Sequence, residues 1–287
     1  ALRGYTIVNL FFEPSTRTRA SFELAGKMLG ADVISVSAST SSVQKGESLI
    51  DTVRTLRAMR SDAIIIRHEM AGAPYLAASH TDAAIINAGD GAHAHPTQAL
   101  LDLYTMQRHV GNLKGKKVVM VGDIAHSRVA RSDLWGLSKM GAHVVLCGPP
   151  TLLPRGLGVT ERPEHAKNAL PFVQIETNID IALKDADVVM ALRLQSERQE
   201  NGLLPSLREY AENYQVTSSR LVKAKSDYLL MHPGPKNEGI EIASDVARGD
   251  RSIIEEQVTN GVAVRMALLY LISGRVETTQ ISERTEI

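Results

Sequence analysis

The regular alternation of short apolar runs with amphipathic segments is the feature that most constrains how this chain can fold. The apolar runs are rich in β-branched residues and are typical of strands, over residues 5–12, 32–36, 63–67, 84–87, 117–122, 143–146, 186–192 and 228–231. Helical periodicity predicts helices between several of them, over residues 15–29, 47–59, 96–109 and 127–139. Strands that alternate with helices form βαβ units, whose strands are parallel. We therefore expect an α/β fold in which central parallel sheets are flanked by helices.

A polar, glycine-bounded stretch from Gly111 to Gly115 separates a long helical segment from a new strand pattern. It divides the chain into two expected α/β domains, residues 1–110 and 111–250, and a length of 287 residues suits two domains. A last amphipathic helix is predicted over residues 252–272, within the C-terminal segment 251–287.

The charge balance excludes a general attraction to polyanions. The 32 basic and 32 acidic residues cancel, so neither nucleic acid nor an anionic membrane is indicated as a partner. Any affinity for phosphate must then come from a local cluster of donors and cations. We find no apolar stretch long enough to span a bilayer and no signal peptide. The single cysteine, Cys147, excludes an internal disulfide and fits a reducing compartment, so a cytoplasmic location is expected.

A cluster of hydroxyls and arginines begins a helix where the first strand ends, in the segment Ser15-Thr16-Arg17-Thr18-Arg19. The first turn of a helix offers unpaired backbone N–H groups and the positive end of the helix dipole to an anion. Arginine adds a planar fork that matches phosphate oxygens. An ordinary capped helix with surface arginines is the alternative, but the combination favours a phosphate site.

Other polar segments occupy comparable positions. Arg67 directly follows a strand, where open parallel sheets place their ligands. His95 and Gln98 are separated by about one helical turn and are able to face one pocket, although a single histidine there is more often structural. The loop of residues 41–47 is a further candidate or a solvated loop. His93 and His95 lack a neighbouring cysteine or carboxylate that would complete a metal site, so no metal is expected.

Taken together, these segments resemble the catalytic chains of the aspartate carbamoyltransferase family, within the aspartate/ornithine carbamoyltransferase superfamily. The resemblance covers nearly the whole chain and is specific because the order and spacing of its motifs agree. The matching segments are residues 11–23 (FFEPSTRTRASFE), 41–47 (SSVQKGE), 67–68 (RH), 87–98 (NAGDGAHAHPTQ), 126–128 (HSR), 193–198 (RLQSER), 232–235 (HPGP) and 256–266 (EQVTNGVAVRM).

The resemblance implies two sets of substrate-binding residues. The carbamoyl phosphate set combines hydroxyls, cations and carbonyls: Ser15, Thr16, Arg17, Thr18, Ser41, Lys45, Arg67, His95, Gln98, Pro233 and Gly234. Of these, the family pattern gives catalytic roles to Arg17, Thr18, Lys45, Arg67 and His95. Gln98 and the backbone carbonyls of Pro233 and Gly234 are expected to receive the carbamoyl amino group. Arg128 and Arg193, assisted by Gln195, are expected to bind the two carboxylates of L-aspartate.

The resemblance also implies an assembly. The first domain would bind carbamoyl phosphate and the second aspartate, and the C-terminal helix would return to the first domain. An N-terminal helix that the family usually carries upstream of Leu2 is expected to be missing. Ser41 and Lys45 would reach into a neighbouring subunit, so a homotrimer with shared sites is expected, with regulatory chains or a dihydroorotase as further partners. Pyrimidine biosynthesis without a cofactor is the implied role, and the Gly234–Pro235 bond is expected to be cis.

Two rival interpretations and one departure qualify the resemblance. Ornithine carbamoyltransferases share the phosphate motif but typically carry an Asp-x-Trp-x-Ser-Met-Gly loop and a His-Cys-Leu-Pro segment. This chain has neither, because its only tryptophan is Trp135 and His232 is followed by proline. A non-catalytic homologue would have lost some of the site residues, and none is lost. The departure is Glu238, where bacterial members commonly carry arginine.

Overall fold

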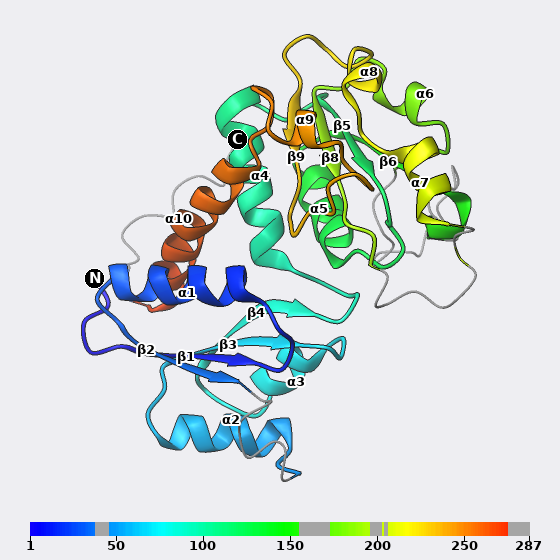
Figure 1. The fold of residues 1–287 in the computed structure, drawn as a ribbon. Coiled ribbons are helices and arrows are strands. Elements are labelled where there is room, and N and C mark those ends of the chain that lie inside the picture. The colour runs from blue at the N-terminus through cyan, green and yellow to red at the C-terminus, as the bar shows by residue number, and fades with distance from the viewer. Residues whose placement is uncertain (38–45, 155–172, 196–202, 204–205, 275–287) are drawn as a thin grey trace, which may run out of the picture. The chain divides into compact units, whose positions relative to one another are not determined.

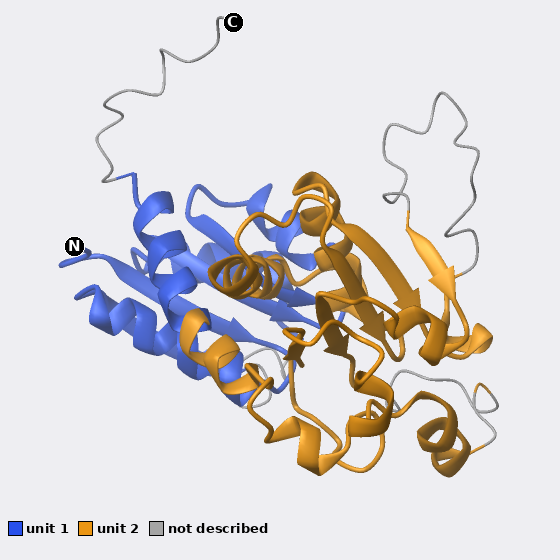
Figure 2. Ribbon diagram, turned by 90° about the horizontal axis from the view of Figure 1, so that it is seen from above, with its two compact units in different colours: residues 1–90, 261–287 blue, residues 91–260 orange. Residues whose placement is uncertain are grey.

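The computed structural model describes residues 1–37, 46–154, 173–195, 203 and 206–274. The chain divides into two compact units, Ala1–Asp90 with Gly261–Ile287, and Gly91–Asn260, which Figure 2 distinguishes by colour. Each unit is built on one parallel sheet flanked by helices. The expected α/β fold class is therefore confirmed. Of the helices that the structure describes, none is long and apolar enough to cross a membrane.

The sheet of the first unit has four strands in the order β2-β1-β3-β4, and every neighbouring pair is parallel. The strands are β1 (Thr6–Phe11), β2 (Asp32–Ser37), β3 (Ala63–His68) and β4 (Ala84–Asp90). The helices that connect them are α1 (Thr16–Met28), α2 (Leu49–Ala58) and α3 (Ala73–Ala78).

Successive side chains of β3 enter different cores because strand residues alternate between the faces of a sheet. Ile65 packs with Phe22 of α1 and with Leu269 of the C-terminal helix, whereas Ile64 packs with Val53 of α2 and Ala77 of α3. Figure 1 shows the same arrangement, with α1 and α10 on one side of this sheet and α2 on the other. Buried apolar side chains on both faces explain why the strands are continuous apolar runs rather than alternating ones.

The sheet of the second unit has five parallel strands in the order β7-β6-β5-β8-β9. They are β5 (Lys117–Val121), β6 (His143–Cys147), β7 (Gln174–Glu176), β8 (Val188–Ala191) and β9 (Leu229–Met231). The long helices are α4 (Pro96–Val110) and α5 (Arg128–Lys139). Shorter ones are η3 (Pro150–Leu152), α6 (Ile179–Leu183), α7 (Leu207–Tyr214), α8 (Ser218–Leu221) and α9 (Ser244–Ala247).

This second sheet is also covered on both faces. Met120 of β5 packs with Met106 of α4 and Leu134 of α5, while its neighbour Val119 packs with Leu183 of α6 and other residues of the opposite face. The two helix layers therefore enclose the strands.

Helix α10 (Ile254–Ile272) belongs to both units, because the division falls between Asn260 and Gly261. Its later part packs in the first unit, where the Arg265 guanidinium carbon lies 5.0 Å from the centre of the Phe22 ring and Leu269 is fully buried. The C-terminal helix thus returns to the first unit, as expected. The domain boundary at residue 110 stays a prediction. The division into compact units falls between Asp90 and Gly91 instead, because α4 packs against α5 of the second unit.

Candidate active site

The start of α1 in the first unit has the properties of an anion site. Ser15 occupies the N-cap position with an extended backbone, and within the described part of the chain its side chain makes no capping hydrogen bond. By contrast, the caps Ser48 of α2 and Ser127 of α5 each accept a bond from a backbone N–H group of their own helix. The first turn of α1 contains no acidic residue. Its N–H groups and the Ser15 hydroxyl are therefore positioned to receive a negatively charged ligand.

Arg67 lies at the same edge of the first sheet. It stands opposite Phe11 in the parallel register of β1 and β3, and its carbonyl accepts a 2.8 Å bond from the Phe12 N–H group. Its guanidinium donates to the Ala88 carbonyl at 3.3 Å and lies 3.1 Å from the Glu13 carboxylate. These contacts hold a partly buried cation beside the segment that leads into α1. The phosphate-binding residues predicted in this unit, Ser15, Thr16, Arg17, Thr18 and Arg67, are thereby brought to one edge.

The loop after β4 is fixed by its own polar groups. The buried Asp90 carboxylate accepts from the Asn87 amide at 2.8 Å and from the Gly72 N–H group at 2.7 Å. The side-chain oxygen Oδ1 of Asn87 in turn accepts from the Gly89 N–H group at 2.7 Å. This loop supplies the Ala88 carbonyl that Arg67 contacts, so the network indirectly holds the arginine in place.

In the second unit, His95 and Gln98 begin α4 and are both buried. The His95 N–H group donates to the Ser132 hydroxyl of α5 at 2.8 Å. The Gln98 amide nitrogen lies 3.1 and 3.2 Å from the two oxygens of Asp102, which is fully buried one turn later. Asp102 was not foreseen as a site residue. Its spacing of four from Gln98 was the available signal, because such a pair shares one helix face.

The segment from His232 to Pro235 follows β9 and is held from two directions. The His232 ring accepts from the Gly234 N–H group at 2.8 Å through Nδ1, and its Nε2 lies 3.3 Å from the buried Glu241 carboxylate. Nε2 therefore carries the proton in this arrangement. The Gly234–Pro235 bond is cis, which confirms the expectation. Because this loop is fixed, the carbonyls of Pro233 and Gly234 have defined positions.

The residues predicted to bind aspartate lie at the carboxyl ends of the neighbouring strands β5 and β8. Arg128 is buried and donates to the Gly91 carbonyl at 3.1 Å. The fully buried Asp123 accepts from the His126 ring at 2.8 Å and from the Gln195 N–H group at 3.3 Å. Asp123 thus joins the loop before Arg128 to the segment that contains Arg193, a role that the motif did not indicate.

Two glycines allow these strand ends to approach each other closely. A Cβ atom on Gly122, where φ is +138°, would lie 2.7 Å from the Leu192 carbonyl oxygen, and one on Gly148 would lie 2.5 Å from the Gly122 oxygen. Both positions require glycine because the opposing atoms belong to the backbone. The close approach brings the ends of β5, β6 and β8 together around the segments that bear Arg128 and Arg193.

Two predicted residues, Ser41 and Lys45, lie outside the described residues. Among the residues that the structure does describe, no group of three or more histidine, cysteine or acidic side chains is arranged to hold a metal ion.

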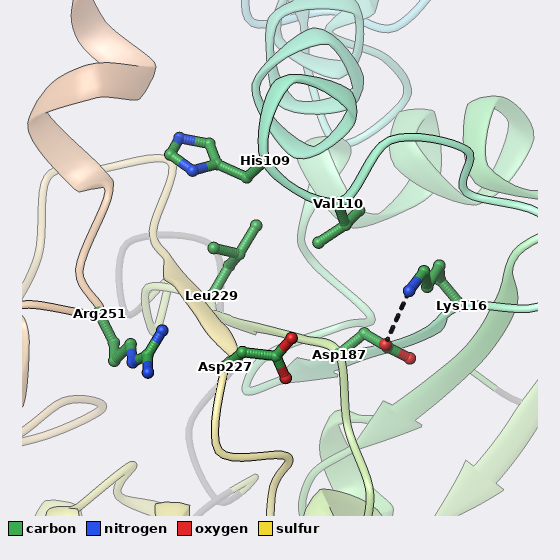
Figure 3. Close-up of a pocket in the computed structure, with 7 residues that line it drawn as sticks. All are labelled: His109, Val110, Lys116, Asp187, Asp227, Leu229 and Arg251. Carbon is green, nitrogen blue, oxygen red and sulfur yellow. Dashed lines mark ion pairs between the residues drawn. The ribbon is translucent and has the colours of Figure 1, made fainter.

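The second unit also contains a cavity of about 330 Å³, which none of the predicted site residues lines (Figure 3). It is lined by His109, Val110, Lys116, Asp187, Asp227, Leu229 and Arg251. Lys116 and Asp187, which lie 3.4 Å apart, directly precede β5 and β8, so the cavity is at the amino edge of the sheet. Ligands of open parallel sheets bind at the opposite, carboxyl edge. Within the second unit, the candidate site is therefore the carboxyl edge of the sheet, which Arg128 and Arg193 follow, and not this cavity.

Comparison with known proteins agrees with the motifs. Residues 1–108 match the family model described as aspartate/ornithine carbamoyltransferase, carbamoyl-P binding domain, and residues 114–272 match the corresponding Asp/Orn binding domain. The chain is 60% identical, over 274 residues, to the aspartate carbamoyltransferase catalytic subunit of Roseiflexus sp. (strain RS-1), a match that covers 95% of this chain and 84% of the relative. It is 57% identical to the corresponding subunit of Dehalococcoides mccartyi, with coverages of 96% and 82%.

Solved structures show the same likeness. An aspartate transcarbamoylase from Trypanosoma cruzi, in complex with carbamoyl aspartate and phosphate, gives a TM-score of 0.81 at 30% identity, covering 94% of this chain and 83% of that one. The ornithine carbamoyltransferase from Pyrococcus furiosus gives a TM-score of 0.80 at 30% identity, with coverages of 96% and 87%. From its two matching domain models and its close relatives, the chain belongs to the aspartate/ornithine carbamoyltransferase family.

Proposed function

We propose that this chain transfers the carbamoyl group of carbamoyl phosphate to the amino group of L-aspartate, giving N-carbamoyl-L-aspartate and phosphate. This reaction is the committed step of de novo pyrimidine synthesis. The observation that carries the proposal is the start of α1, which has neither a side-chain capping bond nor an acidic residue and lies at the same sheet edge as Arg67, in a chain 60% identical to an aspartate carbamoyltransferase catalytic subunit.

Carbamoyl phosphate is assigned to the first domain, residues 1–110, together with residues that follow β9. Ser15, Thr16, Arg17 and Thr18 bind its phosphate through hydroxyls, backbone N–H groups and one guanidinium, with Arg67 as a second cation. The uncapped N-terminus of α1 supports this assignment, since its donors are oriented toward an anion. Pro233 and Gly234 offer carbonyl acceptors to the amino end of the carbamoyl group.

The chemistry needs polarisation and positioning rather than a nucleophilic side chain. The neutral amine of aspartate attacks the carbamoyl carbon, a C–N bond forms, and negative charge develops on the carbonyl oxygen. Thr18, Arg67 and His95 donate to that oxygen, and each donor of this kind contributes about 3 kcal/mol. The C–O bond to phosphate then breaks, and the leaving phosphate accepts the proton that the amine loses. None of these steps requires a cofactor.

Aspartate is assigned to the second domain, residues 111–250, through Arg128, Arg193 and Gln195. Two arginines suit two carboxylates, because each guanidinium pairs with one carboxylate in a planar fork. Holding the amine next to the carbamoyl carbon contributes about 7–11 kcal/mol through proximity. The close packing of the strand ends at Gly122 and Gly148 supports a fixed geometry for this pair of arginines.

A homotrimer is the proposed working unit, with Ser41 and Lys45 of one subunit completing the site of its neighbour. Regulatory chains or a dihydroorotase are the further partners that this family suggests, and the cytoplasm is the proposed location. Neither nucleic acid nor a membrane is proposed as a partner, since positive and negative charges balance over the chain.

Ornithine is the alternative acceptor, and the fold does not separate the two, because the ornithine enzyme of Pyrococcus furiosus is as similar in structure as the aspartate enzyme. The acceptor residues favour aspartate. Arg193 and Gln195 suit a second carboxylate, and the ornithine-type tryptophan loop and His-Cys-Leu-Pro segment do not occur in this sequence.

Measurement of the ureido product tests both the reaction and the acceptor. Purified protein is incubated with carbamoyl phosphate and either L-aspartate or L-ornithine. We expect turnover with aspartate and none above background with ornithine. Turnover with ornithine alone would overturn the acceptor. Absence of turnover with both, in a folded trimer, would favour a non-catalytic member of the family.

A further inference from the structure

A buried hydrogen-bond network in the second unit joins two elements that are assigned to the carbamoyl amino group. Asp102 of α4 accepts from the Gln98 amide at 3.1 and 3.2 Å and from the Gln257 amide of α10 at 2.7 Å. The Gln257 oxygen accepts from the His232 N–H group at 2.9 Å, directly before Pro233. None of these four side chains is more than 9% exposed.

The donors and acceptors in this network determine how the side-chain amides of Gln98 and Gln257 are oriented. A backbone N–H group only donates, so the Gln257 oxygen must face His232 and its NH₂ group must face Asp102. An ionised carboxylate only accepts, so Gln98 also presents its NH₂ group to Asp102. The oxygen of the Gln98 amide is then the atom left to accept a hydrogen bond from a ligand.

A second buried acid, Asp133, lies close enough to Asp102 to respond to its charge. Asp133 of α5 is fully buried, and its pKa is raised well above the ordinary value, first by burial and then by the negative charge of Asp102. The protonated form of Asp133 is therefore favoured, and this form places no second negative charge beside Asp102, which accepts from both amides.

We propose that Asp102 is a positioning residue that holds Gln98 with its oxygen toward the carbamoyl NH₂ group, and that it thereby selects carbamoyl phosphate over acyl phosphates that lack this donor. The inference rests on the proposed function, because it needs Gln98 to contact the carbamoyl group. Acetyl phosphate is the matched probe, since a methyl group replaces the NH₂ group and cannot donate.

The test is the ratio of kcat/KM for carbamoyl phosphate to kcat/KM for acetyl phosphate, with aspartate as acceptor. In Asp102→Asn, Gln257 still donates to Oδ1, so the new NH₂ group replaces Oδ2, one of the two oxygens that the Gln98 amide contacts in the wild type. Two NH₂ groups that face each other repel, so this change favours a turned Gln98 amide, with its oxygen inward and its NH₂ group toward the ligand. We expect the ratio to fall about tenfold, the effect of losing one hydrogen bond. The KM for aspartate should stay within about twofold, because Arg128 and Arg193 are unchanged.

A second variant separates this role from a general loss of packing. In the double variant Asp102→Asn with Gln98→Glu, the introduced glutamate accepts from the introduced asparagine with one oxygen and presents the other to the ligand. The ratio should recover to within about threefold of the wild type, even though the negative charge, moved from position 102 to position 98 beside the ligand, lowers both absolute rates. Asp133→Asn is the control, since it replaces a protonated acid with a neutral amide of similar shape. It should leave the ratio unchanged.

An unchanged ratio in folded Asp102→Asn would overturn the positioning role. A double variant that is inactive with both phosphates, or whose ratio does not recover, would also overturn it. Wild-type protein without carbamoyl transfer would instead refute the proposed function, so the two failures are distinguishable. Should Asp102→Asn not fold, neutron diffraction of the wild type decides the question. Deuterons of the Gln98 amide that face Asp102 support the proposal, and deuterons that face away from it refute it.

Discussion

The Arg67 guanidinium nitrogen Nε lies 3.1 Å from the Glu13 carboxylate, and these side chains are only 12% and 20% exposed. The Glu13 carboxylate thus holds a cation at the carboxyl edge of the first sheet without the help of an anionic ligand. Together with the bond from Arg67 to the Ala88 carbonyl, this pair fixes the arginine in position. A preorganised cation is what stabilisation of a developing oxyanion requires.

Replacement of this cation gives the first prediction. Arg67→Ala should lower kcat/KM for carbamoyl phosphate by about 10²–10³, because one oxyanion donor is lost. Arg57→Ala is the matched control in the same unit, since Arg57 pairs with Asp82 at the surface. Arg57→Ala should change stability little, because solvent screens an exposed ion pair, and it should leave the kinetics unchanged. Steady-state kinetics of both variants test this prediction. Equal kcat/KM values for the two would show that Arg67 has no role in catalysis.

Arg17→Ala should nearly abolish activity, because the phosphate loses a guanidinium fork at the first turn of α1. Lys27, near the end of the same helix, pairs with Glu23 and provides the control substitution to alanine. Binding of inorganic phosphate, followed by calorimetry, should weaken in the first variant and not in the second. Wild-type kinetics in Arg17→Ala would contradict the assigned phosphate site.

Arg193→Ala should raise the KM for aspartate by about 10²-fold, since a charge-assisted contact of about 1.5–3 kcal/mol is lost. The affinity for carbamoyl phosphate should change little, because that ligand is assigned to other residues. Arg208→Ala offers a control in the same unit, where an exposed arginine pairs with Glu212. A variant with unchanged aspartate KM would place Arg193 outside the acceptor site.

Sharing of sites between subunits is tested by complementation. Lys45→Ala and His95→Ala subunits should each be nearly inactive alone. If each site combines Lys45 of one subunit with His95 of its neighbour, a mixed trimer can form one intact site. Dissociation and reassembly of the two variants together should therefore restore part of the activity. Verified hybrids that stay inactive would argue for sites contained within one subunit.

The buried thiol of Cys147 predicts a pH dependence of stability. Burial, and next the charge of Glu176, raise the pKa of Cys147 from 9.0 to about 12. Because the folded state holds this proton more tightly than the unfolded state, the contribution is complete below pH 9 and is lost as the pH rises toward 12. Urea unfolding should show a decline of up to about 1.4 kcal/mol per pH unit in this window, relative to Cys147→Ala. Parallel pH profiles of the two proteins would contradict the expected shift.

Much of the fold can be predicted from local sequence patterns. The long helices and the central strands follow from periodicity and β-branched runs, which are short-range properties. Prediction extended β5 to residue 122, whereas the strand ends at Val121, because Gly122 adopts a φ of +138° and turns the chain. The short strand β7 and the helices α7 and α8 were not foreseen. Helices of eight residues or fewer depend on packing, as Tyr210 and Leu221 show by their burial, rather than on their own periodicity.

The sequence by itself determined the order of the elements and the chemistry at the strand ends, because parallel strands place polar residues that follow them at one edge of a sheet. Only the tertiary structure decided which buried groups support that chemistry. Asp102 and Gln257 stand 155 positions apart in the sequence and meet at 2.7 Å. No local pattern encodes such a pair, since its hydrogen bond forms only after α4 and α10 have packed and water has been excluded from between them.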